Sequence, residues 1–271
     1  MSNLKLIVLV TPDRLSQVQR LPVTPAHLAY RMGRGPHLFR TGSSVSLRGG
    51  YLVVDCLGFD GMGRTDPFCQ EVVRECSARG FTGIICDFEG GRLPPLEQIV
   101  RTLGDQCQHR GWELLIPEPY GSCTPYGKVL LSSALSGGSL LQRLREGLER
   151  FGPDRVALGL ERTAEDFFLP SPTGGGVALT QEELHARMER LQPSVFFSRE
   201  LCARYFTYMS RDSGAHFVLF DDPDTLARKV SLAQSLGIHT VVGAWEELSD
   251  AVSLFPLRPA ESGRAQTRIL R

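Results

Sequence analysis

The sequence predicts an α/β protein, a single (β/α)8 TIM barrel that carries one long insertion subdomain. Three observations predict this fold class. Short apolar runs alternate with helical patterns along the chain, as in folds built on parallel strands. Most of these runs are apolar at every position, which is typical of strands covered on both faces. The length of 271 residues also suits one barrel, which commonly takes about 250 residues.

The strands are predicted from the apolar runs, and eight are needed to close a barrel. Seven runs qualify: Leu4–Val10, Tyr51–Leu57, Phe81–Asp87, Trp112–Ile116, Lys128–Ser133, Arg155–Leu160 and Ile238–Trp245. The remaining strand must lie between Thr11 and Gly50, where Leu28–Arg31 is the best candidate.

Capping residues predict where several helices begin. Asp66-Pro67 and Asp222-Pro223 each place an N-cap residue before a proline at the first helical position. Thr180 and Glu183 have the spacing of a capping box. An apolar stripe at helical spacing runs from Leu140 to Phe151, and we expect it to pack against the core.

The segment Glu161–Phe220 interrupts the alternation between the seventh strand and its return helix. It holds a glycine-rich loop at 174–176, a helix from about Gln181, and a hairpin that pairs Tyr205–Ser210 with His216–Phe220. An insertion at the C-terminal end of a barrel strand lies on the face where barrel enzymes build their active sites. We therefore expect a barrel over 1–255 that includes the insertion 161–220, followed by a flexible tail over 256–271.

Composition restricts the classes of partner. Lys+Arg and Asp+Glu both number 30, so no basic field predicts a nucleic-acid or membrane-surface partner. The seven cysteines form no CxxC pair, and the six histidines have no metal-ligand spacing, so we expect no disulfide framework, no metal and no cofactor. No apolar run approaches the roughly 18 residues of a membrane span, and the first run is too short for a signal peptide. A reducing, cytoplasmic location is the expectation.

Two carboxylates stand at the end of the Phe81–Asp87 run. Because side chains alternate along a strand, Ile85, Asp87 and Glu89 share one face. If that face points inward, two like charges meet at the mouth of the barrel, which raises the pKa of one of them. A carboxyl that stays protonated near neutral pH is suited to general acid catalysis. A salt-bridged or solvated strand end is the alternative.

The run Gly80–Glu89 resembles a degenerate form of the signature of family-18 glycoside hydrolases, Phe-Asp-Gly-x-Asp-x-Asp-x-Glu. The segment Phe220–Leu226 and the stretch Leu236–Trp245 are similar to the end of that fold, and Arg155–Leu160 is similar to its seventh strand. These enzymes include chitinases and are (β/α)8 barrels with the signature on the fourth strand. The resemblance covers roughly Tyr51 to Leu248.

The resemblance implies a retaining, substrate-assisted glycosidase. Glu89 would be the general acid, and Asp87 would orient the substrate's own N-acetyl group, whose oxygen attacks the anomeric carbon. Trp245 would form an apolar floor under the sugar ring, with a core tryptophan as the alternative. Tyr120 is the candidate to replace the tyrosine with which the family holds the acetamido group. Further acids near strand ends are expected to bind sugar hydroxyls or a cation, or to pair with Arg92 and Arg162: Asp55, Glu118, Glu161 and Glu246.

The sequence also departs from the family pattern. Thr82 and Ile85 stand where the signature has acids, and Val129–Ala134 lacks the family's Met-x-Tyr-Asp. Two functions therefore remain open. The first is a glycosidase acting on N-acetylglucosamine-containing glycans, either peptidoglycan or a chitin-like polymer. The second is a catalytically inactive barrel that binds a glycan or a protein.

Overall fold

The computed structural model describes residues 4–41, 46–169, 175–211 and 214–257. Eight parallel strands form a closed barrel, because β1 pairs with both β14 and β2. In chain order the barrel strands are β1 (Lys5–Val10), β2 (Thr24–Met32), β4 (Tyr51–Asp55), β5 (Gly83–Asp87), β6 (Glu113–Pro117), β7 (Lys128–Ser132), β8 (Val156–Gly159) and β14 (Thr240–Ala244). The predicted (β/α)8 barrel is confirmed, and its missing strand is β2, which contains Leu28–Arg31.

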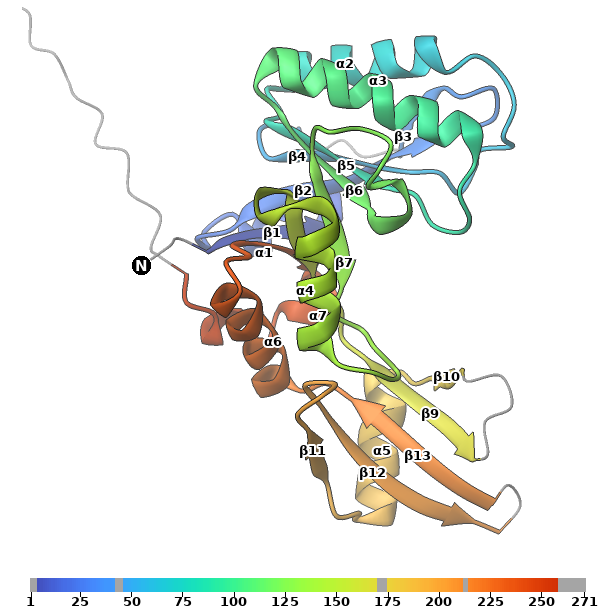
Figure 1. Cartoon of the computed structure of the whole chain (residues 1–271), viewed down its shortest axis with the longest axis vertical. Coiled ribbons are helices and arrows are strands. Elements are labelled where there is room, and N and C mark those ends of the chain that lie inside the picture. The colour runs from blue at the N-terminus through green and yellow to red at the C-terminus, as the bar shows by residue number, and fades with distance from the viewer. Residues whose placement is uncertain (1–3, 42–45, 170–174, 212–213, 258–271) are drawn as a thin grey trace, which may run out of the picture.

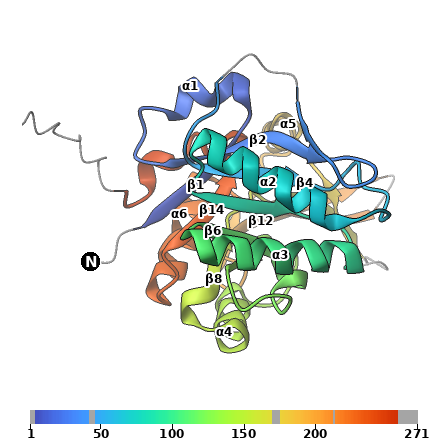
Figure 2. The same ribbon diagram turned by 90° about the horizontal axis from the view of Figure 1, so that it is seen from above.

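Helices cover the outside of this barrel (Figures 1 and 2). They are α1 (Leu15–Val18), α2 (Thr65–Arg79), α3 (Pro94–Arg110), α4 (Leu140–Phe151), α6 (Pro223–Ser235) and α7 (Trp245–Leu248), with 3-10 turns η1 (Pro12–Arg14), η2 (Glu118–Tyr120), η3 (Pro153–Arg155) and η4 (Val252–Leu254). Two strands lack a return α-helix among the described residues. After β2 the chain forms β3 (Leu38–Arg40), antiparallel to β2, and after β6 only η2 precedes β7.

Most of the predicted helix starts are confirmed. Asp222 caps α6 with Pro223 in its first turn, and Thr180 forms a capping box with Glu183 at α5 (Gln181–Leu191). The prediction for Asp66 is wrong: α2 already begins at Thr65, so Asp66 lies in its first turn. A proline is tolerated throughout the first turn of a helix, because the backbone N–H groups there have no partner within the helix. Its position therefore does not identify the exact residue at which the helix begins.

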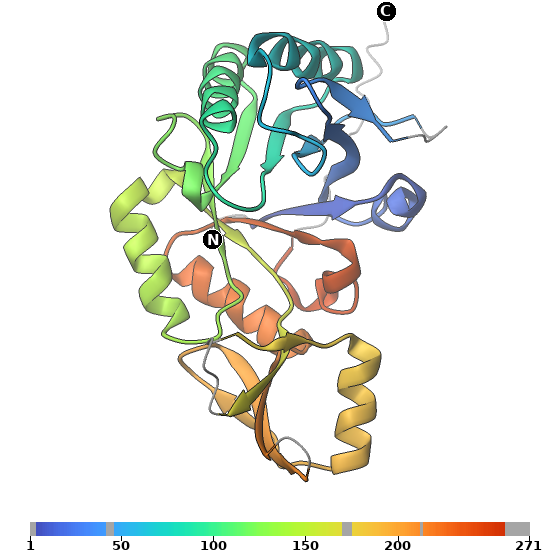
Figure 3. The ribbon, with the colours of Figure 1, turned by 90° about the vertical axis from the view of Figure 1, so that its right-hand side faces the viewer.

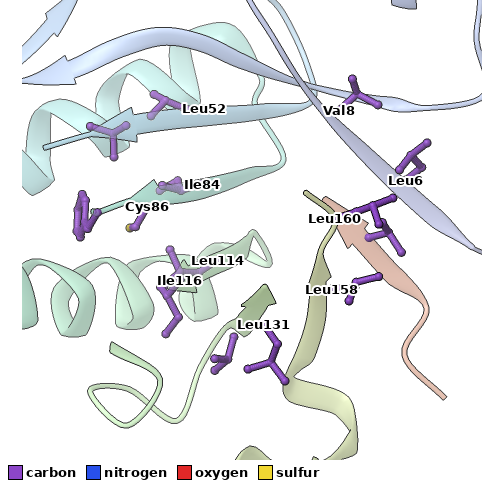
Figure 4. Packing of buried hydrophobic residues seen from close by; sticks show 14 of the residues in the cluster. Leu6, Val8, Leu52, Ile84, Cys86, Leu114, Ile116, Leu131, Leu158 and Leu160 are labelled. Atoms are coloured by element: carbon purple, nitrogen blue, oxygen red, sulfur yellow. The ribbon is translucent and has the colours of Figure 1, made fainter. Parts of the chain in front are cut away.

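Strand alternation divides the apolar side chains into two cores. One fills the barrel interior and includes Ile7, Val53, Ile85 and Val242. The other lies between the barrel and its helices and is shown in Figure 4, with Leu6, Leu52, Ile84 and Cys86 among its members. Ile85 therefore points inward and Ile84 outward, so Asp87 lies on the inward face of β5 at the strand's end.

A second sheet lies between β8 and α6, in the segment predicted to be an insertion. Its five antiparallel strands have the order β10-β9-β13-β12-β11. They are β9 (Ala164–Leu169), β10 (Val177–Ala178), β11 (Phe196–Ser198), β12 (Ala203–Ser210) and β13 (Gly214–Phe220). The predicted hairpin is confirmed, since β12 pairs with β13 and Ser210 faces Gly214. Figures 1 and 3 show this sheet projecting from the barrel, with α5 along one of its faces.

A buried ion pair stabilises the point at which the chain passes from the insertion back to the barrel. The Asp221 carboxylate, which directly follows β13, accepts hydrogen bonds from Lys229 Nζ at 2.6 Å, from the Thr225 hydroxyl at 2.8 Å and from the Thr163 backbone N–H at 2.9 Å. Both charged residues are 1% exposed. The pair thus joins α6 to the start of β9 inside the protein.

Parts of the sequence predictions lie outside the described residues. These parts are Gly174 of the glycine-rich loop and the tail beyond Leu257. The domain boundaries therefore stay a prediction. Within the described part of the chain, no helix has both the length and the apolar character needed to cross a membrane.

Candidate active site

A cavity of about 630 Å³ opens at the C-terminal mouth of the barrel. It is lined by the ends of β5, β6, β7, β8 and β14, so strands far apart in sequence meet around it. Five carboxylates and one arginine are the charged residues of its wall: Asp87, Glu89, Glu118, Glu161, Glu247 and Arg143. This is the face on which barrel enzymes carry out their chemistry.

The two carboxylates of the resembling signature both line this cavity. Asp87 is half-buried, and Glu89, just beyond β5, is exposed. Burial raises the pKa of Asp87, and the charges of Glu89 and Asp55 raise it further. Arg92 does not neutralise Glu89, because its guanidinium binds Glu97 at 2.6 Å. No described cation forms an ion pair with either carboxylate of the signature.

Three further acids predicted near the site have different surroundings. Glu118 lines the cavity and pairs with Arg143 at 2.6 Å. Glu161 also lines it, and desolvation raises the pKa of its carboxyl. Asp55 of β4 pairs in register with Asp87 of β5. Its carboxylate forms an ion pair with Arg31 at 3.0 Å, and Asp55 is not part of the cavity wall.

Tyr120 does not replace the family's acetamido-binding tyrosine. Its side chain is fully buried in the core between barrel and helices, edge-on to Phe88 with ring centroids 6.0 Å apart. Its hydroxyl donates to the Gly91 carbonyl at 3.3 Å and accepts from the Leu93 N–H at 3.4 Å. The turn η2 directs Tyr120 outward, where it supports the loop that follows Glu89.

Trp245 also lies outside the cavity wall, which corrects the expectation of a sugar floor. Val242 of β14 points into the barrel, so Ala244 is the next inward position and the following residue turns away. The Trp245 indole N–H donates to Gln17 Oε1 of α1 at 2.6 Å. The structure thus supports the alternative, a tryptophan packed against the outer core.

Two wall residues were missed by the sequence predictions. Glu247 lines the cavity, whereas its neighbour Glu246, which was considered instead, binds Arg14 at 3.0 Å away from it. The only feature of the sequence that pointed to Glu247 was its position shortly after a predicted strand. Arg143 comes from α4, and no sequence pattern pointed to it. Among the described residues, no three histidine, cysteine or acidic side chains are grouped so as to hold a metal ion.

Comparison with known proteins identifies the fold. No protein-family model matches the sequence, and no curated protein matches it. Solved structures do match. The spore cortex-lytic enzyme SleL of Bacillus megaterium QM B1551 has a TM-score of 0.67 at 12% identity, over 95% of this chain and 75% of that one. A chitinase from Chromobacterium violaceum has a TM-score of 0.67 at 15% identity, over 93% of this chain and 97% of its own.

A third similar structure carries a ligand. It is a variant of the class V chitinase from Nicotiana tobaccum in complex with NAG4, with a TM-score of 0.62 at 11% identity, over 94% of this chain and 99% of that one. Identities this low establish similarity of fold only. By its closed barrel, its insertion after β8 and these structural matches, the chain has the chitinase-like barrel fold that its resemblance to family-18 glycoside hydrolases predicted.

Proposed function

We propose that this protein is a glycoside hydrolase that acts on N-acetylglucosamine-containing glycans, with Glu89 as the general acid and Asp87 as the residue that orients the N-acetyl group. The observation that carries the proposal is that Asp87 and Glu89 line one cavity at the mouth of the barrel with no described cation paired to either. The ligand bound by the tobacco chitinase variant supports a carbohydrate as the occupant.

In the proposed reaction, Glu89 donates its proton to the glycosidic oxygen while the acetamido oxygen of the same sugar attacks the anomeric carbon. The bond to the leaving sugar breaks, and a cyclic oxazolinium forms. Asp87 accepts a hydrogen bond from the acetamido N–H and so directs the acetamido oxygen toward the anomeric carbon. Glu89, now ionised, takes a proton from water as that water opens the ring, which restores Glu89 and retains the anomeric configuration.

A catalytically inactive glycan-binding barrel is the second candidate. This candidate is favoured because Tyr120 and Trp245 lie outside the cavity wall. The cavity therefore lacks the two aromatic side chains that the resemblance implied. Ile85 lies in the apolar interior below Asp87, so no acid shares a proton with Asp87 from that side.

Turnover of N-acetylglucosamine oligomers by wild type and by Glu89→Gln tests the proposal. We expect the variant to lose a factor of roughly 10²–10⁴ in kcat, the usual contribution of a general acid. Glu246→Gln is the control, because Glu246 pairs with Arg14 and does not line the cavity. Binding of oligomers without turnover in wild type, unchanged in Glu89→Gln, would favour the inactive module instead.

We also propose a reducing, cytoplasmic location. The seven cysteines are all free, and all but Cys56 are buried. Burial raises the pKa of several of these thiols, such as Cys76 and Cys107, which keeps them protonated and unreactive.

A further inference from the structure

We propose that Tyr120 is a positioning residue for Glu89: its buried hydroxyl holds the loop 90–93, and the loop holds the Glu89 carboxylate in the cavity beside Asp87. The inference rests on the proposed function, which gives Glu89 its catalytic role. Tyr120 is fully buried and lies outside the cavity wall, so it can affect the reaction only through the residues that it contacts.

The Glu89 carboxylate is not held by contacts of its own. Glu89 is exposed and stands two residues beyond Asp87, the last residue of β5. Within the part of the chain that the structure describes, no group forms a hydrogen bond or an ion pair with this carboxylate. The Cys56 thiol reaches only the Glu89 backbone carbonyl, at 3.9 Å. The place of the carboxylate in the cavity therefore depends on the path of the backbone on either side of it.

The backbone that follows Glu89 has little to hold it by packing. The next two residues are Gly90 and Gly91, and a Cβ added to either would meet no atom within 4 Å. Gly90 has a φ of 85°, in the left-handed region that favours glycine. Glycine loses more conformational freedom on ordering than any other residue. A fixed path for this loop therefore needs hydrogen bonds from another part of the chain.

Tyr120 contacts this segment on both sides of Glu89. Its hydroxyl donates to the Gly91 carbonyl at 3.3 Å and accepts from the Leu93 N–H at 3.4 Å. Its ring lies edge-on to Phe88, the residue between Asp87 and Glu89. Burial raises the pKa of the Tyr120 hydroxyl, which therefore keeps the proton that it donates. Water competes little for these bonds, because the tyrosine side chain is fully buried.

The two ends of this arrangement are themselves fixed. Tyr120 belongs to the turn η2, and its carbonyl accepts a hydrogen bond from the Cys123 N–H at 2.9 Å. Leu93 is the N-cap residue of α3, and its carbonyl accepts from the Glu97 N–H at 3.0 Å. The hydroxyl thus joins the loop after Glu89 to two regular elements of the barrel.

Tyr120→Phe isolates the role of the hydroxyl, because it keeps the ring and the contact with Phe88. The variant frees the Gly91 carbonyl and the Leu93 N–H. A catalytic group displaced by about 1 Å can cost a factor of about 10² in rate. We expect kcat for N-acetylglucosamine oligomers to fall about ten- to hundredfold. KM should change by less than about a factor of two, because the residues that line the cavity remain.

Titration of the Asp87 carboxyl by carbon-detected NMR gives a second readout that needs no turnover. Burial, and then the charges of Glu89 and Asp55, raise the pKa of Asp87. If Tyr120 keeps Glu89 near Asp87, the pKa of Asp87 should be lower in Tyr120→Phe than in wild type. Tyr30→Phe is the matched control. It also removes a buried hydroxyl, which donates to Glu75 at 2.8 Å, and Tyr30 does not line the cavity.

Equal losses of kcat in Tyr120→Phe and Tyr30→Phe would indicate a general effect of an altered core and overturn the proposal. So would a raised KM with unchanged kcat, or an unchanged Asp87 titration in Tyr120→Phe. If that variant does not fold, hydrogen exchange of wild type decides: the Leu93 amide should exchange at least about tenfold more slowly than the Gly90 amide, and equal rates would refute the hold. Absence of turnover in wild type would refute the proposed function alone, since the Asp87 titration still tests Tyr120.

Discussion

Replacement of Asp87 by asparagine should stabilise the protein while it impairs catalysis. Asp87 ends β5 and Glu89 stands two residues further on, a spacing of about 6.6 Å if those residues were fully extended. At that separation two unit charges repel by about 2.5 kcal/mol at an effective dielectric constant of 20 and by about 0.6 kcal/mol in water. Because Glu89 is exposed, a value near 1 kcal/mol is expected. That corresponds to a rise in Tm of about 2–4 °C for a chain of this size.

The effect of Asp87→Asn should depend on pH in a defined direction. Burial and two nearby carboxylates raise the pKa of Asp87 above 3.8, so the folded state disfavours its ionised form. The loss of folding stability caused by ionised Asp87 is absent below pH 3.8, grows as the pH rises through the raised pKa, and persists at neutral pH. Asparagine removes it, so the gain in Tm should be present at neutral pH and should shrink as the pH falls toward 3.8.

Thermal unfolding followed by circular dichroism, together with turnover of N-acetylglucosamine oligomers, checks both halves of this prediction. Asp55→Asn is the control, because Asp55 occupies the same register on β4 but is paired with Arg31. That variant should gain no stability. A Tm of Asp87→Asn several degrees below wild type at neutral pH would refute the reasoning, since it would mean that the Asp87 carboxylate holds the fold together.

Three further predictions concern residues outside the signature. Lys229→Met should cost about 3–5 kcal/mol in denaturant unfolding, because it leaves the buried Asp221 charge unpaired, and Asp221→Asn in the same chain should recover part of it. Burial lowers the pKa of His27, so stability should fall as the pH drops below 6.5, by at most about 1.4 kcal/mol per pH unit; His27→Gln should flatten that slope in pH-dependent unfolding. Trp245→Phe should leave glycan affinity in calorimetry unchanged, whereas a tenfold loss would restore the sugar-floor role.

Much of the barrel could be predicted because its signals are local. Apolar runs and capping residues each depend on a few neighbouring positions, and parallel strands with helical returns have few arrangements that bury them. Strand β2 was the weakest prediction, since the segment that follows it forms β3 rather than a helix. Asp66 marked the first turn of α2 but not its first residue.

The sequence by itself predicted Asp87, Glu89, Glu118 and Glu161 at the mouth, because the C-terminal ends of parallel barrel strands converge there. The same rule also predicted Asp55, which pairs with Arg31 and does not line the cavity. Only the tertiary structure decided which neighbours join them. Trp245 turns away because its indole binds Gln17, which lies 228 residues earlier in the chain. The partners of Arg162 were likewise decided by the tertiary structure: its guanidinium binds Asp250 and the backbone carbonyl of Glu247, and no pattern of neighbouring residues encodes that choice.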